Sequence, residues 1–206
     1  MTEMTQTFVS FWSFSSFKLL FMSEEHFIPK HGGYENLQSY RRSLVVYQAT
    51  RAFCKSYFQK YDRTIGQMVQ AARSGKQNII EGSMASGTSK ETEIKLTNVA
   101  RASLEELLED YRDILREHHF EEWDKTHRYA RRLSELLQNP DADYETFRPA
   151  VEHDELAIRV NAIIGLIKVT NFLLNQQLRQ LEQDFIQNGG LREAMTRTRI
   201  NRRNKS

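Results

Sequence analysis

Residues 82–90 read GSMASGTSK, a run of glycines and small hydroxyl residues that ends in lysine, as a phosphate-binding loop does. Such a loop has the pattern G-x-x-x-x-G-K-[ST] between a strand and a helix, and its lysine reaches the β- and γ-phosphates. Here Gly82 and Gly87 have the required spacing, but Thr88 takes the place of the lysine and Lys90 comes two residues later. The preceding residues, AARSGKQNII, have helical periodicity and not that of a buried strand. We therefore interpret this stretch as an interhelical turn and not as a nucleotide site.

The densest cluster of potential metal ligands comprises His118, His119, Glu121, Glu122 and His127. A di-iron helical protein needs two Glu-x-x-His motifs and two further carboxylates, whereas this cluster offers only one Asp-x-x-His spacing, from residue 124 to residue 127. We interpret these histidines as a solvated helix end. No serine or cysteine has the surroundings of a nucleophile, so we predict no catalytic residue, no metal, no cofactor and no enzymatic activity.

The net charge of +2 conceals a strong asymmetry along the chain. Residues 35–87 carry a net charge of +5, residues 88–187 carry −7, and residues 188–206 again carry +5. Clustered arginines and lysines contact phosphates, so the two basic segments predict nucleic-acid binding, with Tyr40 and Tyr47 available for stacking on bases. The alternatives are a solubilising tail and pairing of basic surfaces with the acidic middle of a neighbouring subunit. The predicted nucleic-acid contacts are Arg41, Arg42, Arg63, Arg73, Lys76, Arg192, Arg197, Arg199, Arg202, Arg203 and Lys205, and Arg51 could add to the first group.

Helix-forming residues dominate the sequence, which has only three prolines. We therefore predict that the chain that positions these residues is all-α. Apolar periodicity predicts helices over about 37–60, 65–82, 88–114, 121–137 and 152–187. We expect Gly82 to end the second helix and Thr88 to cap the third, with Glu91 completing a capping box. Gly75 lies in the seam of the second helix, where we expect it to allow close helix packing. Gly189-Gly190 is expected to end the last helix, and the tail after it to need a partner in order to become ordered.

The first 33 residues are predicted to lie outside the fold. The segment from Phe8 to Phe21 is apolar, but it has no basic region before it, contains Lys18 and is too short to span a bilayer. We expect translation to start at Met22; the alternative is an interfacial anchor. The single Cys54 excludes an intramolecular disulfide and fits a reducing cytoplasm. We divide the rest into core helices over 34–118, a short and a long helix over 119–188, and a basic tail over 189–206.

The stretch QMVQAARSGKQNIIEGSMASGTSKETEIKLTNVARASLEELLEDY, residues 67–111, resembles a bacterial four-helix-bundle family. That family includes proteins encoded by intervening sequences in large-subunit rRNA genes. The positions that carry the resemblance are Gln67, Ala71, Ala72, Ser74, Asn78, Ile79, Glu81, Gly82, Ser89, Lys90, Glu91, Leu96, Ala100, Ser103, Leu104, Glu105 and Leu107. Lys76 stands where many members have proline, and Gly75 replaces a branched apolar residue. The segments NPDADYETF and RQLEQDFIQNGGLREAMTRTR resemble a C-terminal "suffix" extension carried by one branch of the family.

The resemblance implies an up-down four-helix bundle with an additional short helix, assembled as a ring-like pentamer. A distant relative is the accessory protein of diversity-generating retroelements, so a reverse transcriptase is an implied partner. No catalytic residues are established for the family. We therefore expect a non-enzymatic, cytoplasmic homo-oligomer that binds RNA, DNA or a nucleoprotein and does not enter a membrane. The alternative is a structural or protein-interaction module without nucleic-acid binding.

A chain that begins at Met22 is expected to be as soluble, as helical and as stable as the full chain, because the segment from Phe8 to Phe21 has no helical core partner. Circular dichroism and urea denaturation of the two chains check this. A loss of folding on removal of residues 1–21 would show that the apolar segment belongs to the domain.

Overall fold

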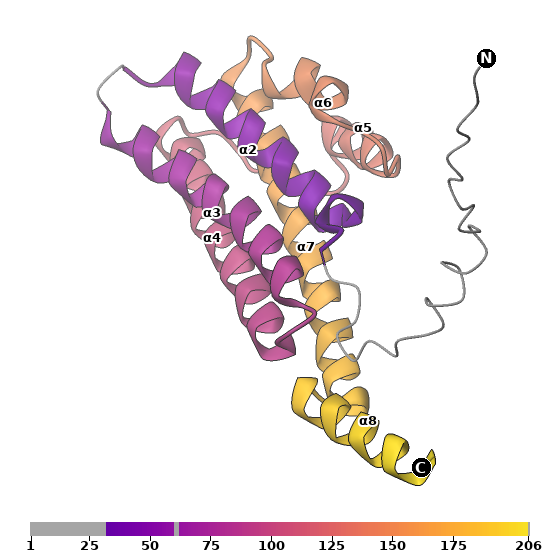
Figure 1. Ribbon diagram of the computed structural model, residues 1–206. Helices are drawn as coiled ribbons and strands as arrows, with labels where there is room; N and C mark the ends of the chain where they lie inside the picture. Colours follow the sequence, from indigo (N-terminus) through magenta and orange to yellow (C-terminus); the bar gives the residue numbers. More distant parts are fainter. Residues whose placement is uncertain (1–31, 60–61, 206) are drawn as a thin grey trace, which may run out of the picture.

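The computed structural model describes residues 32–59 and 62–205, and within these ranges the regular secondary structure is helical, without strands (Figure 1). The predicted all-α class is confirmed. The segment from Phe8 to Phe21 and Met22 lie outside the described residues, so the expectations about them stay predictions. The elements are the 3-10 helix η1 (Tyr34–Asn36) and the α-helices α2 (Gln38–Tyr57), α3 (Arg63–Ala85), α4 (Lys90–Glu117), α5 (Arg128–Leu137), α6 (Tyr144–Val151), α7 (Leu156–Asn188) and α8 (Leu191–Lys205).

Four long helices surround one hydrophobic core. Helix α2 packs on α3 and α7, and α4 packs on the same two helices (Figure 1). The shorter α5 and α6 lie against α7, and α6 also contacts α2. Phe53, Leu104 and Ile163 belong to the same buried cluster although they come from three different helices. The predicted ranges 34–118 and 119–188 therefore share one core and are not separate units.

Helices α3 and α4 approach each other closely at Gly75. A Cβ atom placed on Gly75 would lie 2.7 Å from the side chain of Leu104, which is itself fully buried. At the preceding position of each helix, the hydroxyl groups of Ser74 and Ser103 form a hydrogen bond of 2.9 Å that joins the two helices. A side chain at position 75 would require the buried Leu104 side chain to shift, which is the physical reason for glycine in this seam.

The turn between α3 and α4 differs from the prediction in two ways. Gly82 does not end α3; it is buried inside the helix, where a Cβ atom would lie 3.4 Å from the carbonyl oxygen of Glu93. Close packing on α4 thus explains this glycine, as it explains Gly75. Ser89, and not Thr88, caps α4, because the Ser89 hydroxyl accepts a hydrogen bond from the backbone N–H of Thr92.

The segment between α4 and α7 contains a shorter helix than predicted and a second helix that was not predicted. Trp123 lies in a loop, because α5 begins only at Arg128. Helix α6 was missed, and the last long helix begins at Leu156 and not at residue 152. Asp143 caps α6 in a capping box with Thr146, where the usual glutamate or glutamine is absent. Pro149, a residue that normally argues against a helix, lies inside α6.

The C-terminal segment is helical, which corrects the expectation of a tail without structure. Gly189 ends α7 with a φ of 68°, a left-handed conformation that favours glycine, and α8 starts two residues later. Glu193 accepts a hydrogen bond from the backbone N–H of Gly190 and so caps the new helix. Helix α8 lies at the end of the molecule where α7 projects past α3 and α4 (Figure 1).

Helix α7 and its continuation are long and apolar enough to cross a bilayer by length and composition. More than half of the most apolar window, 56%, is buried inside the protein. The core helix of a protein that never enters a membrane passes the same test, so this is weak evidence for a membrane span.

Replacement of Gly75 by alanine is expected to lower the free energy of unfolding by about 1–3 kcal/mol, because overpacking against Leu104 outweighs the better helix propensity of alanine. Gly66 provides the matched control in the same helix, since among the described residues no atom outside the adjoining helix backbone lies within 4 Å of a Cβ atom placed there. Gly66→Ala should raise stability by about 0.5–1 kcal/mol. Urea denaturation measures both; equal effects of the two substitutions would refute the close approach.

Candidate nucleic-acid interface

Two positively charged side chains, one from α2 and one from α3, lie over the ring of Tyr47. The guanidinium of Arg51 lies 5.7 Å from the centre of the Tyr47 ring, and the ammonium of Lys76, from the neighbouring helix, lies 5.6 Å from it. Within the described residues no ion pair engages any of these cations, and α2 has no acidic residue. The surface, called here the α2–α3 basic face, consists of Tyr47, Arg51, Lys55, Arg73 and Lys76. Arg63 lies eleven residues before Ser74 and therefore on the side of α3 that faces α4.

Two predicted contacts on α2 do not belong to this face. Arg41 forms an ion pair of 2.7 Å with Asp141 and donates a hydrogen bond to the carbonyl of Glu35. Arg42 is only 2% exposed, so its prediction as a phosphate contact is wrong. Its guanidinium donates hydrogen bonds to three backbone carbonyls of the α5–α6 connection, those of Leu137, Asn139 and Ala142.

The burial of Arg42 has an electrostatic cost. Burial lowers the pKa of the Arg42 guanidinium, and the charge of Arg41 lowers it further. The ring of Phe147, on α6, lies 5.7 Å from the guanidinium carbon and supplies a favourable cation–π contact. Arg42 therefore fastens the α5–α6 connection to α2, and its charge is used inside the protein.

The arginines of α8 divide into structural and solvent-facing ones. Arg197 donates a hydrogen bond of 2.5 Å to the carbonyl of Asn188, at the end of α7, and so holds α8 in place. Arg192, Arg199 and Arg203 are exposed, and no contact within the described residues engages them. Arg202 is exposed but has a contact, and the side chain of Lys205 lies outside the described residues. The predicted basic tail is thus a helix that presents three unengaged arginines.

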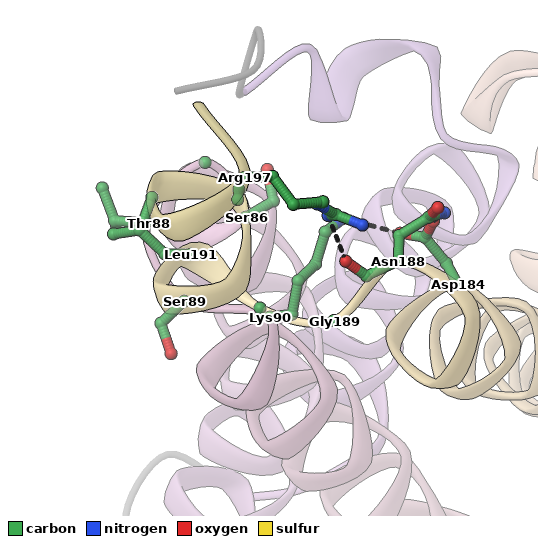
Figure 2. Close-up of a pocket in the computed structure, with 12 residues that line it drawn as sticks. Ser86, Thr88, Ser89, Lys90, Asp184, Asn188, Gly189, Leu191 and Arg197 are labelled. Atoms are coloured by element: carbon green, nitrogen blue, oxygen red, sulfur yellow. Dashed lines mark hydrogen bonds and ion pairs between the residues drawn. The ribbon is translucent and has the colours of Figure 1, made fainter. Parts of the chain in front are cut away.

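The GSMASGTSK turn lines a pocket of about 320 Å³ together with the end of α7 and the start of α8 (Figure 2). The cations of this pocket already have partners. Lys90 lies 3.3 Å from carboxylate oxygens of both Glu93 and Asp184. Burial alone would lower the pKa of Lys90, but these two carboxylates raise it above its ordinary value. The turn connects two helices and lacks the preceding strand of a phosphate-binding loop. At this pocket Lys90 joins α4 to α7, and Arg197 joins α8 to the end of α7.

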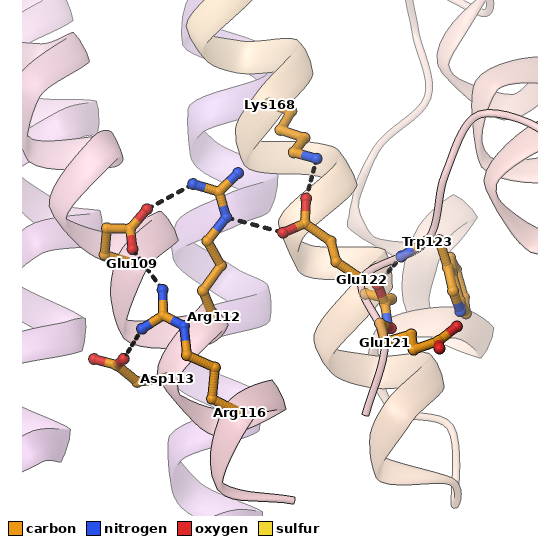
Figure 3. Close-up of polar contacts among 9 residues, drawn as sticks. Glu109, Arg112, Asp113, Arg116, Glu121, Glu122, Trp123 and Lys168 are labelled. Carbon is orange, nitrogen blue, oxygen red and sulfur yellow. Dashed lines mark hydrogen bonds and ion pairs between the residues drawn. The ribbon is translucent and has the colours of Figure 1, made fainter. Parts of the chain in front are cut away.

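The linker between α4 and α5 is fastened by an ion-pair network (Figure 3). Glu122 lies between Arg112 of α4, at 2.9 Å, and Lys168 of α7. Burial acts to raise the pKa of Glu122, but the hydrogen bonds from both cations outweigh it and hold that pKa below its ordinary value. The side-chain amide of Asn161 adds two hydrogen bonds: its nitrogen donates to the Glu121 carbonyl, and its oxygen accepts from the backbone N–H of Trp123.

The histidines considered as metal ligands have other partners. Nε2 of His118 lies 2.7 Å from the hydroxyl of Tyr57, and His127 stacks on Trp123 with ring centres 4.7 Å apart. Within the residues that the structure describes, no three His, Cys, Asp or Glu side chains are placed to hold a metal ion together. Cys54 is buried, and burial first, then the charges of nearby aspartates, raises the pKa of its thiol to about 12. The thiol is protonated at neutral pH, which disfavours nucleophilic chemistry.

Lys55 was not among the predicted contacts, although the sequence contains a signal for it. Arg51 and Lys55 are spaced i, i+4, so they share a helix face, and no acidic residue of α2 neutralises them. Lys76 could be predicted as basic, but its position over Tyr47 depends on the packing of α3 on α2.

Comparison of the chain with protein-family models, with curated proteins and with solved structures finds no match.

Replacement of Arg42 by alanine is expected to lower the free energy of unfolding by about 3 kcal/mol, because it leaves three carbonyl groups without their donor. Arg41→Ala, which removes an exposed ion pair and an exposed hydrogen bond to the Glu35 carbonyl, should cost about 1 kcal/mol or less. Urea denaturation of the two variants tests the assignment. Similar decreases in the free energy of unfolding for both variants would show that Arg42 does not hold the α5–α6 connection against α2.

Proposed function

We propose that the protein is a non-enzymatic, cytoplasmic, self-associating helical bundle that binds nucleic acid through the α2–α3 basic face. Helices α2, α3, α4 and α7 would be the four members of an up-down bundle. The pairwise packing of these helices around one core supports that arrangement. The resemblance of residues 67–111 supports the same arrangement and adds a nucleoprotein, such as a reverse transcriptase, as an alternative partner.

The observation that carries the nucleic-acid proposal is the set of unpaired cations around Tyr47. The four basic residues of this face, on two adjacent helices, have no ion pair within the described residues, and only Glu81 adds an acidic residue along α3. Phosphate contacts of this kind release counterions from nucleic acid and provide affinity without sequence selectivity. Tyr47 is half-buried, and Arg51 and Lys76 lie over its ring, so the tyrosine holds these two cations next to each other for phosphate contacts. Helix α8 has arginines but no aromatic residue, so it lacks this combination.

A fluorescently labelled single-stranded RNA and a labelled DNA duplex are suitable probes. Binding to the parent protein should be measurable by anisotropy at low salt and should weaken steeply as salt is added. The variant Arg51→Ala, Lys55→Ala, Arg73→Ala should bind less tightly. Its dependence of log K on log salt should be flatter by about 2–3 units, or about 0.7–0.9 for each phosphate that the protein no longer neutralises.

The matched control removes the same charge from dispersed exposed positions and comprises Lys95→Ala, Arg131→Ala and Arg179→Ala. It should leave the salt dependence close to that of the parent. Equal weakening by both triple variants would show that only net charge matters and that the α2–α3 basic face is not the site. A parent that binds neither probe at low salt would leave the structural or protein-interaction module as the function.

A further inference from the structure

Helix α4 presents a row of acidic side chains to solvent. The row, called here the α4 acidic stripe, consists of Glu106, Asp110, Asp113 and Glu117. The spacings of 4, 3 and 4 residues place all of them on one face of the helix. Of these only Asp113 has an ion pair within the described residues, with Arg116 of the same helix. Glu106 and Glu117 are exposed and have none.

The stripe is unfavourable in an isolated subunit. Like charges one helical turn apart repel each other. Burial is the main cause that raises the pKa of the half-buried Asp110, and the negative charges of Glu106 and Asp113 raise it further. A cationic surface placed over the stripe would remove the repulsion and gain attraction.

Helix α8 has a basic row of the same length. Arg192, Arg199 and Arg203 lie on one face, with Thr196 at the intervening position, so the helical positions follow the same 4, 3, 4 spacing. From Arg192 to Arg203 and from Glu106 to Glu117 the helix rises by the same distance, about 16 Å. The half-buried residues of α8, such as Leu191, Ala194 and Thr198, lie on a different face, which leaves the arginines accessible.

The two rows cannot meet within one subunit. The ion pair between Lys90 and Asp184 fixes the end of α7, and hence the start of α8, beside the first turn of α4. Glu106 lies 16 residues further along α4 and Glu117 lies 27 residues further, which are distances of about 24 and 40 Å. Helix α8 extends at the opposite end of the molecule from the C-terminal half of α4 (Figure 1).

We propose that the arginine row of α8 docks on the α4 acidic stripe of a second copy of this chain. The inference builds on the self-association proposed above and specifies its interface. Because the two surfaces are different and lie at opposite ends of the subunit, the contact is head-to-tail. An exposed apolar group beside the arginine row, Ile200 on α8, adds apolar area to the charge pairs. The α2–α3 basic face uses none of these residues and stays free.

Charge reversal tests the interface. The arm variant carries Arg192→Glu, Arg199→Glu and Arg203→Glu, and the stripe variant carries Glu106→Lys, Asp113→Lys and Glu117→Lys. At low salt, light scattering should give the parent a mass several times that of one subunit and each variant the mass of a single subunit. A chain with all six substitutions, or an equimolar mixture of the two variants, should regain the multiple mass, because opposite charges face each other again.

Circular dichroism must show that every variant keeps its helicity, and Lys125→Glu, Arg131→Glu, Arg179→Glu is the control with the same charge change as the arm variant. This control should keep the parent's mass. A monomeric parent would overturn self-association as a whole. A parent that assembles while both reversed variants also assemble, or variants that fail to recover when combined, would overturn the docking alone. Loss of nucleic-acid binding in the arm variant with unchanged mass would assign the arginines to nucleic acid and reject the docking.

Discussion

The close approach of α3 and α4 at Gly75 is the constraint on which the rest of the arrangement depends. Without a side chain at that position the two helices pack closely enough for Ser74 and Ser103 to form a hydrogen bond between them. The pair then provides a continuous apolar surface, which α2 and α7 cover from two sides. Because the inner faces are apolar, most charged residues lie on the outer faces of the helices, although Arg42 is buried. The sign of that charge differs between helices: it is basic on α2 and α3 and acidic on the second half of α4.

The sequence predicted those features whose causes are local. The seams of α3 and α4 were predictable because apolar residues recur at helical spacing, and Gly75 was predictable because it interrupts a seam at the cost of helix propensity. Gly82 was misassigned because a packed glycine and a capping glycine look alike until the neighbouring helix is placed. Arg42 was misassigned for a similar reason: its three acceptors lie 95 to 100 residues away along the chain. Helix α8 was missed because Gly189-Gly190 was interpreted as an end, whereas Glu193 restarts the helix there.

Because the basic and the acidic residues lie on different helices, the subunit has separate surfaces that can bind different partners at the same time. The basic face on α2 and α3 lies on helices that neither contribute to the α4 acidic stripe nor include α8. Binding of nucleic acid at the first surface would therefore not compete with contacts between copies at the others. Both kinds of contact are electrostatic and weaken with salt, so ionic strength would set how much of each occurs. Charge pairs exposed to solvent are individually weak, and several copies acting together are needed for stable binding.

The turn at Gly189 has a geometric consequence for an assembly of this kind. It alone sets the direction of α8 relative to α7, with the hydrogen bond from Arg197 to the Asn188 carbonyl holding the angle. In a head-to-tail contact that angle fixes the rotation from one copy to the next. A rotation that divides a full circle evenly closes the assembly at a fixed number of copies, and any other rotation produces an open helix. Two glycines, far from the acidic stripe, would thus determine the number of subunits.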